Sequence, residues 1–284
     1  MTDAFPVAAV QFGARLYAPD QNRARAETAI RSAAGKGARL VVLPELAISG
    51  YGLDPEGLAR SAEPGDGPTV TGWLALAAEL DVVISGGFCE TAGGNLHNSA
   101  VLVTPEGSAT LYRKLHLFDG EKNVFSPGDR GLPVVETALG QIGLCVCYDL
   151  RFVEVARALA LMGADVIAVP TAWVGGFDRN ARDAMGFIGQ ARGAMVQANL
   201  NQVAMVCASQ SGGDQGIRFL GSSLIVDSFG ECLAGPSEQD ADETLIASLD
   251  IAAIRASRVR SALVRPREDR RIDVYGLTVS GTTY

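Results

Sequence analysis

The sequence has few of the residues that metal sites and disulfide frameworks require. It contains two histidines and five cysteines, and no Cys-x-x-Cys pair. Metal-ligand sets of the usual spacing cannot be assembled from so few residues, so we expect no metal and no cofactor. An odd number of cysteines at irregular spacings also argues against a disulfide framework and indicates a reducing cytoplasm.

Long apolar runs are absent as well. Although 48% of the residues are hydrophobic, no uninterrupted run approaches the roughly 18 residues that indicate a membrane span. The first five residues lack the basic start of a signal peptide, so we expect a protein that is not exported. No Pro/Gly/Ser-rich linker or block of charge divides the chain, which favours one large α/β domain over residues 1–284.

Basic residues are also scarce relative to acidic ones. The formal net charge is −8, and the only basic cluster, residues 265–271, alternates with acids. Phosphate binding needs concentrated Lys and Arg, so the composition argues against a nucleic-acid partner. The cluster is better interpreted as a solvated or subunit-facing surface.

Apolar runs typical of strands alternate with patterns typical of helices. The first half begins β-α-β-α-β and continues with a hairpin, and the second half repeats a strand-helix-strand stretch and a hairpin. A further helix is expected over about 178–199, before a strand at 202–208. This order predicts two similar sheets in a mixed, layered α/β domain. The segments are strands 7–11, 40–43 and 82–84, helices 22–36 and 70–80, hairpins 99–112 and 222–234, and the strand-helix-strand stretch 138–169.

Cys147 is the best candidate for a nucleophile. It lies where the apolar strand around residues 142–146 gives way to a predicted helix. A helix N-terminus favours negative charge and therefore the reactive thiolate. Cys145, two residues earlier on the same face, is interpreted as core. Because an isolated cysteine in an apolar segment is more often a small buried hydrophobe, Cys147 needs reacting partners nearby.

Neither histidine is a convincing base for this thiol. For His97 and His116, a hydrogen-bonded structural role is at least as well supported as catalysis. Glu45 directly follows a buried strand, where desolvation raises a carboxyl pKa toward values that suit a general base. Lys114 holds the matching place after another strand, from which its ammonium could stabilise a thiolate and an oxyanion. Glu121 is either a further site residue or an ordinary loop carboxylate.

The three candidates Glu45, Lys114 and Cys147 share one structural feature. Each follows the carboxyl end of a predicted strand, the edge where open α/β sheets place their sites. A single Glu or Lys at a strand end is more often a surface charge. Three reacting groups at three strand ends make coincidence the weaker explanation.

Taken together, these residues resemble the nitrilase, or carbon–nitrogen hydrolase, superfamily. The likeness covers about residues 6–250, with three linked motifs in the family's order and spacing. Many relatives carry proline where this chain has Val153. Proline at this place suits the first turn of a helix but takes no part in the reaction, so the difference puts little in doubt. The motifs are Leu43-Pro-Glu-Leu46 with Gly50-Tyr51, Tyr112-Arg-Lys-Leu-His-Leu-Phe118 with Phe125-Ser-Pro-Gly128, and Gly143-Leu-Cys-Val-Cys-Tyr-Asp-Leu-Arg-Phe152 with Glu154.

The resemblance implies a four-layer αββα sandwich with two mixed sheets flanked by helices. It also implies that Glu45 is the general base, that Lys114 supports the tetrahedral intermediate and that Cys147 forms a thioester. Glu121 would position the substrate or the base–lysine pair, and the backbone N–H of Tyr148 would help to hold the oxyanion. At least a homodimer is expected through the flanking helices, with the C-terminal extension 251–284 at the interface.

The sequence after the nucleophile resembles amidase branches, including ω-amidases, whereas true nitrilases usually carry Cys-Trp-Glu. We therefore expect hydrolysis of a small aliphatic carboxamide, with ω-amides among the candidates, to an acid and ammonia. An N-carbamoyl amino acid or amine amidohydrolase is the alternative; a nitrilase or an inactive binding protein is less favoured. The residues expected to shape specificity are the loop 170–178 with Trp173, together with Tyr51, Phe118 and Phe125. Arg151 either binds a substrate carboxylate or forms an ion pair with Asp149 or Glu154.

Overall fold

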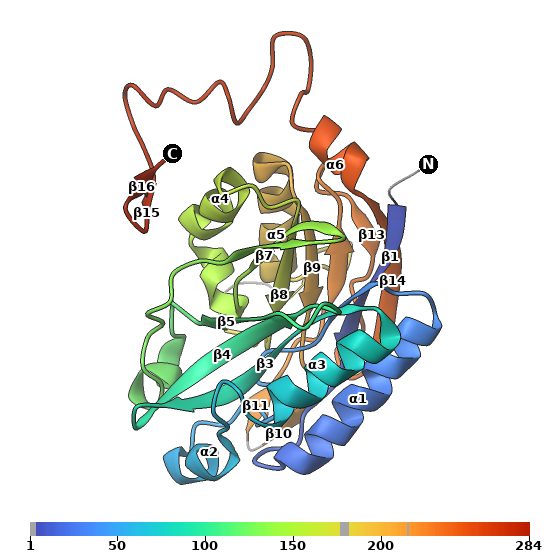
Figure 1. Cartoon of the computed structure of the whole chain (residues 1–284), viewed down its shortest axis with the longest axis vertical. Helices are drawn as coiled ribbons and strands as arrows, with labels where there is room; N and C mark the ends of the chain where they lie inside the picture. The colour runs from blue at the N-terminus through green and yellow to red at the C-terminus, as the bar shows by residue number, and fades with distance from the viewer. Residues whose placement is uncertain (1–3, 177–181, 215) are drawn as a thin grey trace.

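Strand β1 (Ala4–Gln11) is apolar on both faces and therefore needs a packed layer on each side. Because successive side chains of a strand point to opposite faces, Val7 and Ala9 pack in a cluster that includes the second sheet. Ala8 and Val10 pack in a separate cluster with helices. The computed structural model describes residues 4–176, 182–214 and 216–284, and in it two sheets lie face to face between helices (Figure 1).

The first sheet has six strands in the order β14-β1-β2-β3-β4-β5. Strands β1, β2 and β3 are parallel, whereas β14, β4 and β5 pair antiparallel with their neighbours. The predicted hairpin at 99–112 is confirmed as β4 and β5. The bounds are β2 Leu40–Val42, β3 Val83–Ala92, β4 Asn95–Val103, β5 Ala109–Arg113 and β14 Glu243–Asp250.

The second sheet repeats this arrangement in the order β13-β12-β9-β8-β7-β6. Its three central strands are parallel, with one antiparallel strand on one side and two on the other. The prediction of two similar sheets is therefore confirmed. The bounds are β6 Val134–Thr137, β7 Gly140–Leu144, β8 Val166–Pro170, β9 Ala204–Ala208, β12 Leu224–Val226 and β13 Cys232–Ala234.

Helices connect the parallel strands and cover the outer faces, which confirms the expected αββα layers (Figure 1). Helices α1 and α3 cover the first sheet, and α4 and α5 cover the second. Short helices and two-stranded hairpins lie at the periphery. The bounds are α1 Pro19–Gly35, α2 Pro55–Ser61, α3 Pro68–Leu80, α4 Val153–Leu161, α5 Gly189–Asn201, α6 Ile251–Ala256, β10 Gly213–Asp214, β11 Ile217–Arg218, β15 Thr278–Val279 and β16 Thr282–Thr283.

The helix expected over 178–199 begins later than predicted, and residues 178–181 lie outside the described part of the chain. Asp183 accepts hydrogen bonds from the backbone N–H groups of Met185 and Phe187, and Gly186 has a φ of 83°. This side chain stabilises a turn in place of a helix. Helix α5 therefore starts only at Gly189. No helix in the described ranges is long and apolar enough to cross a bilayer.

Asp165 ties the end of the sandwich to the C-terminal helix. Its carboxylate is fully buried and accepts hydrogen bonds from Arg255, from Arg258 and from the backbone N–H of Gln141. Burial acts to raise the pKa of Asp165, but the hydrogen bonds from Arg255 and Gln141 and the charge of Arg258 outweigh it. The pKa of Asp165 is therefore held below its usual range, so its contribution to stability is present at neutral pH and is lost as the pH falls.

We predict that Asp165→Asn lowers the free energy of unfolding by about 2–4 kcal/mol, because it leaves two arginines without their buried partner. Urea denaturation at pH 7 measures this change. The matched control is Asp273→Asn, which breaks the exposed pair with Arg271 and should cost less than about 0.5 kcal/mol. Equal losses in both variants would show that the buried carboxylate has no special role.

Candidate active site

The three reacting candidates come from three strand ends in two sheets. Glu45 lies three residues beyond the end of β2, and Lys114 directly follows β5, both in the first sheet. Cys147 lies three residues beyond β7 in the second sheet and begins a short 3₁₀ helix, Cys147–Arg151. The backbone N–H of Glu45 donates to the carbonyl of Thr171, just after β8, at 3.1 Å. The site is therefore assembled across the contact between the two sheets.

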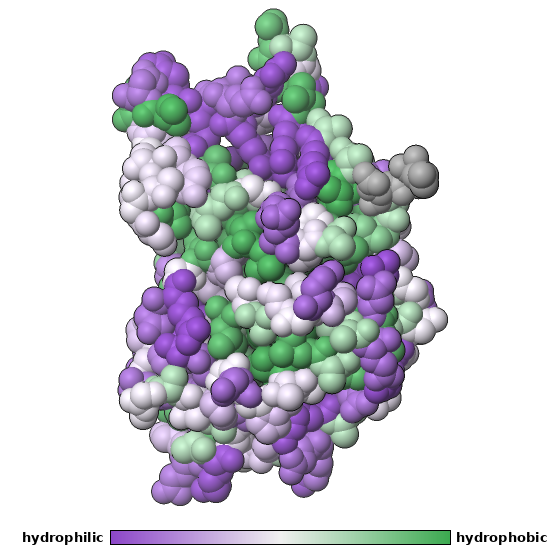
Figure 2. Space-filling model, in the orientation of Figure 1, coloured by the Kyte–Doolittle hydropathy of each residue, from purple (hydrophilic) through white to green (hydrophobic). Residues whose placement is uncertain are grey.

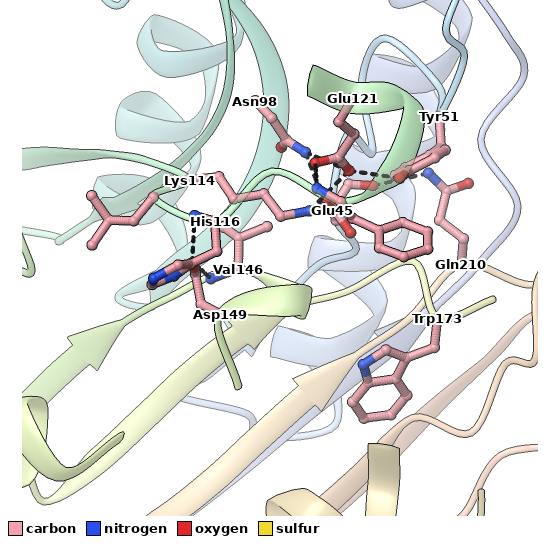
Figure 3. A network of polar contacts seen from close by, with 12 residues as sticks. Glu45, Tyr51, Asn98, Lys114, His116, Glu121, Val146, Asp149, Trp173 and Gln210 are labelled. Carbon is pink, nitrogen blue, oxygen red and sulfur yellow. Dashed lines mark hydrogen bonds and ion pairs between the residues drawn. The ribbon is translucent and has the colours of Figure 1, made fainter. Parts of the chain in front are cut away.

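A buried ion cluster forms its centre (Figure 3). The Nζ of Lys114 lies 2.6 Å from Glu45 Oε1 and 2.9 Å from Glu121 Oε1, and all three side chains are at most 1% exposed. Asn98 donates to Glu45 Oε1 at 2.7 Å, and the hydroxyl of Tyr51 donates to Glu121 Oε1 at 2.6 Å. Two carboxylates and one ammonium thus share a site without solvent, where charges interact strongly.

The two carboxylate oxygens of Glu45 have different surroundings. Oε1 accepts hydrogen bonds from Lys114 and Asn98, whereas Oε2 is buried and has no hydrogen-bond partner in residues 4–176, 182–214 and 216–284. Burial and the charge of Glu121 raise the pKa of Glu45 and outweigh the effect of Lys114. Burial alone would lower the pKa of Lys114, but Glu45 and Glu121 raise it well above its usual value. Lys114 therefore stays positively charged beside Glu45, a carboxylate that can take up a proton.

The charges of this cluster also influence the thiol of Cys147. Burial raises the pKa of Cys147 well above its usual value; Glu45 adds to this effect, while Lys114 and a hydrogen bond with the Ala172 backbone oppose it. A helix N-terminus was expected to favour the thiolate, but only a five-residue 3₁₀ helix follows Cys147, and α4 begins at Val153. Burial favours the protonated form of the thiol, so its ionisation requires a base.

One buried carboxylate connects the segments that carry Cys147 and Lys114. Asp149 accepts a hydrogen bond from the backbone N–H of Val146 at 2.9 Å and from the Tyr112 hydroxyl at 2.7 Å. Its other oxygen accepts from the backbone N–H of His116 at 3.1 Å and contacts His116 Nδ1 at 2.8 Å (Figure 3). His116 also stacks on Phe152. His116 is thus hydrogen-bonded and structural, and Asp149 fixes the separation of the two strand ends.

Two carboxamides that the sequence did not single out complete the surroundings of Glu45. Asn98 donates to both Glu45 and Glu121, the latter at 3.4 Å. Gln210 donates to the backbone carbonyl of Glu45 at 2.9 Å and accepts from the N–H of Ala14 at 3.0 Å. Both are fully buried or nearly so. Asn98 lies within β4 just before its apolar stretch, and Gln210 lies two residues after β9. A polar amide beside an apolar strand run was therefore the available signal for each.

Two glycines allow the backbones of the site to approach closely. A Cβ on Gly87 would lie 2.4 Å from the backbone nitrogen of Leu46 and 2.8 Å from the Cα of Glu45. A Cβ on Gly128 would lie 2.0 Å from the carbonyl oxygen of Arg113, next to Lys114. These contacts are shorter than real Cβ contacts allow, so both positions require glycine.

A cavity of about 340 Å³ opens beside Cys147. Of the four residues predicted to bind substrate, Tyr148, Trp173 and Phe118 line it, as does Arg151. Tyr51 instead lines a second cavity of about 260 Å³, to which Phe118 also contributes. Phe125 is buried in a cluster with Tyr51 and lines neither of these two cavities.

We compared the whole chain with known protein families, known sequences and solved structures. The family model described as carbon–nitrogen hydrolase matches residues 6–259. The sequence is 36% identical to a nitrilase from Pyrococcus abyssi over 95% of this chain and 98% of that protein. It is 37% identical to an (R)-stereoselective amidase from a Pseudomonas species, over 84% of this chain and 82% of that protein.

Two further likenesses cover nearly the whole chain. An N-carbamoylputrescine amidase from Solanum lycopersicum is 35% identical over 97% of this chain and 96% of that protein. The crystal structure of a carbon–nitrogen hydrolase from Helicobacter pylori superposes with a TM-score of 0.83 at 28% identity, covering 96% of this chain and 97% of that one. The fold of two mixed sheets flanked by helices is thus shared with that hydrolase.

We predict that Gly87→Ala lowers kcat at least about tenfold and destabilises the protein by about 1–3 kcal/mol, because the added methyl displaces the backbone of Glu45. The control is Gly72→Ala in α3, where no atom lies within 4 Å of the new methyl and helix propensity improves. Steady-state kinetics and thermal melts compare the two variants. Full activity in Gly87→Ala would show that the placement of Glu45 tolerates this displacement.

Proposed function

The chain belongs to the carbon–nitrogen hydrolase family, and from this membership we propose that it is an amidase that hydrolyses a small aliphatic carboxamide to an acid and ammonia. ω-Amides of dicarboxylic acids are included among the candidate substrates. One observation carries the proposal: within the described part of the chain, Oε2 of the fully buried Glu45 has no hydrogen-bond partner, and Glu45 belongs to an ion cluster whose charges shift the pKa of the Cys147 thiol. That arrangement provides a base, a fixed cation and a nucleophile in one site.

In the first half of the reaction, Glu45 removes the proton of the Cys147 thiol as the sulfur attacks the amide carbon. The carbonyl oxygen then becomes an oxyanion, which the ammonium of Lys114 and the backbone N–H of Tyr148 stabilise. Glu45 returns its proton to the amide nitrogen, the C–N bond breaks and ammonia leaves. The product of this half is a thioester on Cys147.

In the second half, water attacks the thioester carbon while Glu45 takes one of its protons. The second tetrahedral intermediate uses the same two oxyanion donors. When it collapses, the C–S bond breaks, the sulfur recovers a proton from Glu45 and the carboxylic acid is released. One carboxylate thus acts as base and then as acid in each half, which suits its raised pKa.

Glu121 has a positioning role in this scheme. Its Oε1 accepts a hydrogen bond from Lys114 next to Glu45, and its other oxygen accepts from the backbone N–H of Phe118 at 2.9 Å. Phe118 lines the cavity beside Cys147. Glu121 therefore couples the position of the lysine to a wall of the substrate site.

An N-carbamoyl amidohydrolase is the second candidate, because the N-carbamoylputrescine amidase noted above covers nearly the whole chain. The same attack on a ureido carbon would release ammonia and leave a carbamoyl group on Cys147. Hydrolysis would then give a carbamic acid, which loses carbon dioxide to yield an amine. We also propose that the protein works in the cytoplasm, since its five cysteines are unpaired.

The C-terminal segment supports a homodimer as the working form. Beyond α6 it projects from the sandwich and returns beside α4, where Arg267 donates to the carbonyl of Ala160 (Figure 1). Figure 2 shows the projecting part at the top of the molecule. Leu263, Ile272 and Val274 are 90%, 68% and 70% exposed. Large apolar side chains exposed along one segment indicate a surface that another protein covers. We propose that a second copy of the chain covers this one.

We predict that wild-type protein releases ammonia from amides and that Cys147→Ala loses this activity at least about a thousandfold while remaining folded. Glu45→Gln should show a comparable loss. The panel contains aliphatic amides, ω-amides, N-carbamoyl compounds and nitriles. Cys232→Ala, which alters a half-buried cysteine outside the site, should remain fully active. Equal turnover in Cys147→Ala would rule out the mechanism, and turnover of N-carbamoyl compounds alone would favour the second candidate.

We predict that the double substitution Ile272→Asp with Val274→Asp shifts a dimer toward monomer, because it places two charges in an apolar contact. Light scattering coupled to size-exclusion chromatography measures the mass in solution. The control is Leu233→Asp, at an exposed apolar residue of β13, which should leave the mass unchanged. A wild-type protein that is monomeric at micromolar concentration would contradict the proposal.

A further inference from the structure

A cavity of about 600 Å³ lies between the C-terminal segment and two helices of the second sheet. Its walls come from α4, from α5 and from residues 266–277. Figure 1 shows this segment arching away from the sandwich and returning beside α4. We propose that the cavity binds a small organic anion, whose carboxylate or phosphate group is held by the guanidinium groups of Arg157 and Arg270. This inference goes beyond the proposed function, because Cys147 does not line the cavity.

The folded chain does not neutralise its one basic cluster, residues 265–271. The cluster contains four arginines, of which two form ion pairs within the C-terminal segment. In the part of the chain that the structure describes, Arg267 and Arg270 have no acidic partner and donate only to backbone carbonyl groups. The two pairs that do form are Arg265 with Glu268 and Arg271 with Asp273.

Arg267 anchors the segment to the carboxyl ends of both helices. It donates to the carbonyl of Ala160 in the last turn of α4 and to that of Asn201 at the end of α5. Carbonyl groups at a helix C-terminus carry only a partial negative charge. Burial and the charges of Arg258 and Arg157 lower the pKa of Arg267 to about 10. Positive charge beside the cavity is therefore in excess.

The two arginines that line the cavity are half-buried and unpaired. Arg157 donates to the carbonyl of Leu200 at 2.9 Å, and its Nη1 is buried with no hydrogen-bond partner among the described residues. Arg270 donates to the backbone oxygen of Tyr284 at 3.1 Å and lies over the ring of Tyr275. Burial and the charge of Arg270 lower the pKa of Arg157. Two guanidinium groups thus come from opposite walls of one cavity, and neither has a counter-charge.

An anion would remove this imbalance. A guanidinium group that loses part of its hydration without gaining an acid costs free energy, and a second cation nearby adds to the cost. One carboxylate or phosphate group in the cavity compensates both arginines, because its oxygens match the planar array of guanidinium donors. The chain as a whole has a formal net charge of −8, so a surplus of cations at one cavity is a local feature.

One acidic side chain also lines the cavity. Glu154 precedes Arg157 by three residues on α4, but among the described residues it forms no ion pair with either lining arginine. Its side chain is exposed to water. Two cations and one carboxylate leave the lining with a net positive charge. Because the charge of Glu154 opposes an anion, its removal should strengthen binding.

The rest of the lining favours a ligand larger than an inorganic ion. A volume of about 600 Å³ lies within the range that small-molecule sites occupy. Apolar side chains provide much of the wall, so an anionic group on an apolar or aromatic body should bind more tightly than inorganic phosphate. Ile272 and Val274, which are proposed for the dimer contact, do not line the cavity. The apolar and aromatic lining residues are Val153, Leu200, Pro266, Tyr275 and Leu277.

Isothermal titration of the wild-type protein with phenyl phosphate and with benzoate tests the inference, with benzyl alcohol as the neutral control. At least one of the anions should bind at least about tenfold more tightly than the alcohol, equivalent to about 1.4 kcal/mol. Binding of the alcohol as tight as that of both anions would overturn the inference. So would the absence of anion binding at millimolar concentration, which is the result expected if a carboxylate of a second copy already fills the position.

Matched variants show whether the anion binds in this cavity. Arg270→Gln should weaken its binding at least about tenfold, because a charge-assisted contact is lost. Arg271→Gln alters the neighbouring arginine, which is paired with Asp273 and does not line the cavity, and should change the affinity less than about twofold. Glu154→Gln should tighten binding. Equal losses in the two arginine variants, an unchanged affinity in Arg270→Gln, or weaker binding in Glu154→Gln would each contradict the proposed site.

Discussion

The buried contact between Lys114 and the carboxylates of Glu45 and Glu121 is the constraint on which the rest of the site depends. Removing three charges from water is costly, and the cost is tolerable only when each charge has close partners. Asn98 and Tyr51 supply the remaining hydrogen bonds. Among the residues that the structure describes, Glu45 Oε2 is the one carboxylate oxygen of the cluster without a hydrogen-bond partner, and it is the atom that acts as the base in the proposed reaction. Burial makes the cluster costly in desolvation free energy, but it also strengthens the electrostatic interactions of Glu45 and Lys114 with a bound substrate.

The repeated sheet arrangement explains how these charges come together. Each half of the chain forms three parallel strands with antiparallel neighbours, and the two sheets pack face to face. Glu45 and Lys114 emerge from one sheet and Cys147 from the other. Close backbone contacts at Gly87 and Gly128, together with the hydrogen bonds of Asp149, then hold the segments at a fixed separation. Sheet packing and a few buried polar groups thus replace the histidine that a nucleophilic cysteine usually relies on.

Burial is the physical basis of the proposed chemistry. It raises the pKa of both the Cys147 thiol and Glu45, so in the proposed reaction the proton passes between two groups that are neutral when protonated. The neighbouring cavity is lined mainly by apolar side chains.

By itself, the sequence determined the layered fold and the repeated halves, because strand periodicity is a local property. It also proposed Glu45, Lys114 and Cys147 as the reacting groups from their positions at strand ends. It also predicted the raised pKa of Glu45 from its place after a buried strand. It misplaced the start of α5, since the side chain of Asp183 stabilises a turn that periodicity does not record. Only the tertiary structure decided that burial raises the pKa of the Cys147 thiol, that Asn98 and Gln210 support Glu45, and that Asp149 joins the two strand ends. Those properties depend on burial and on contacts between residues far apart in the chain, which no local pattern encodes.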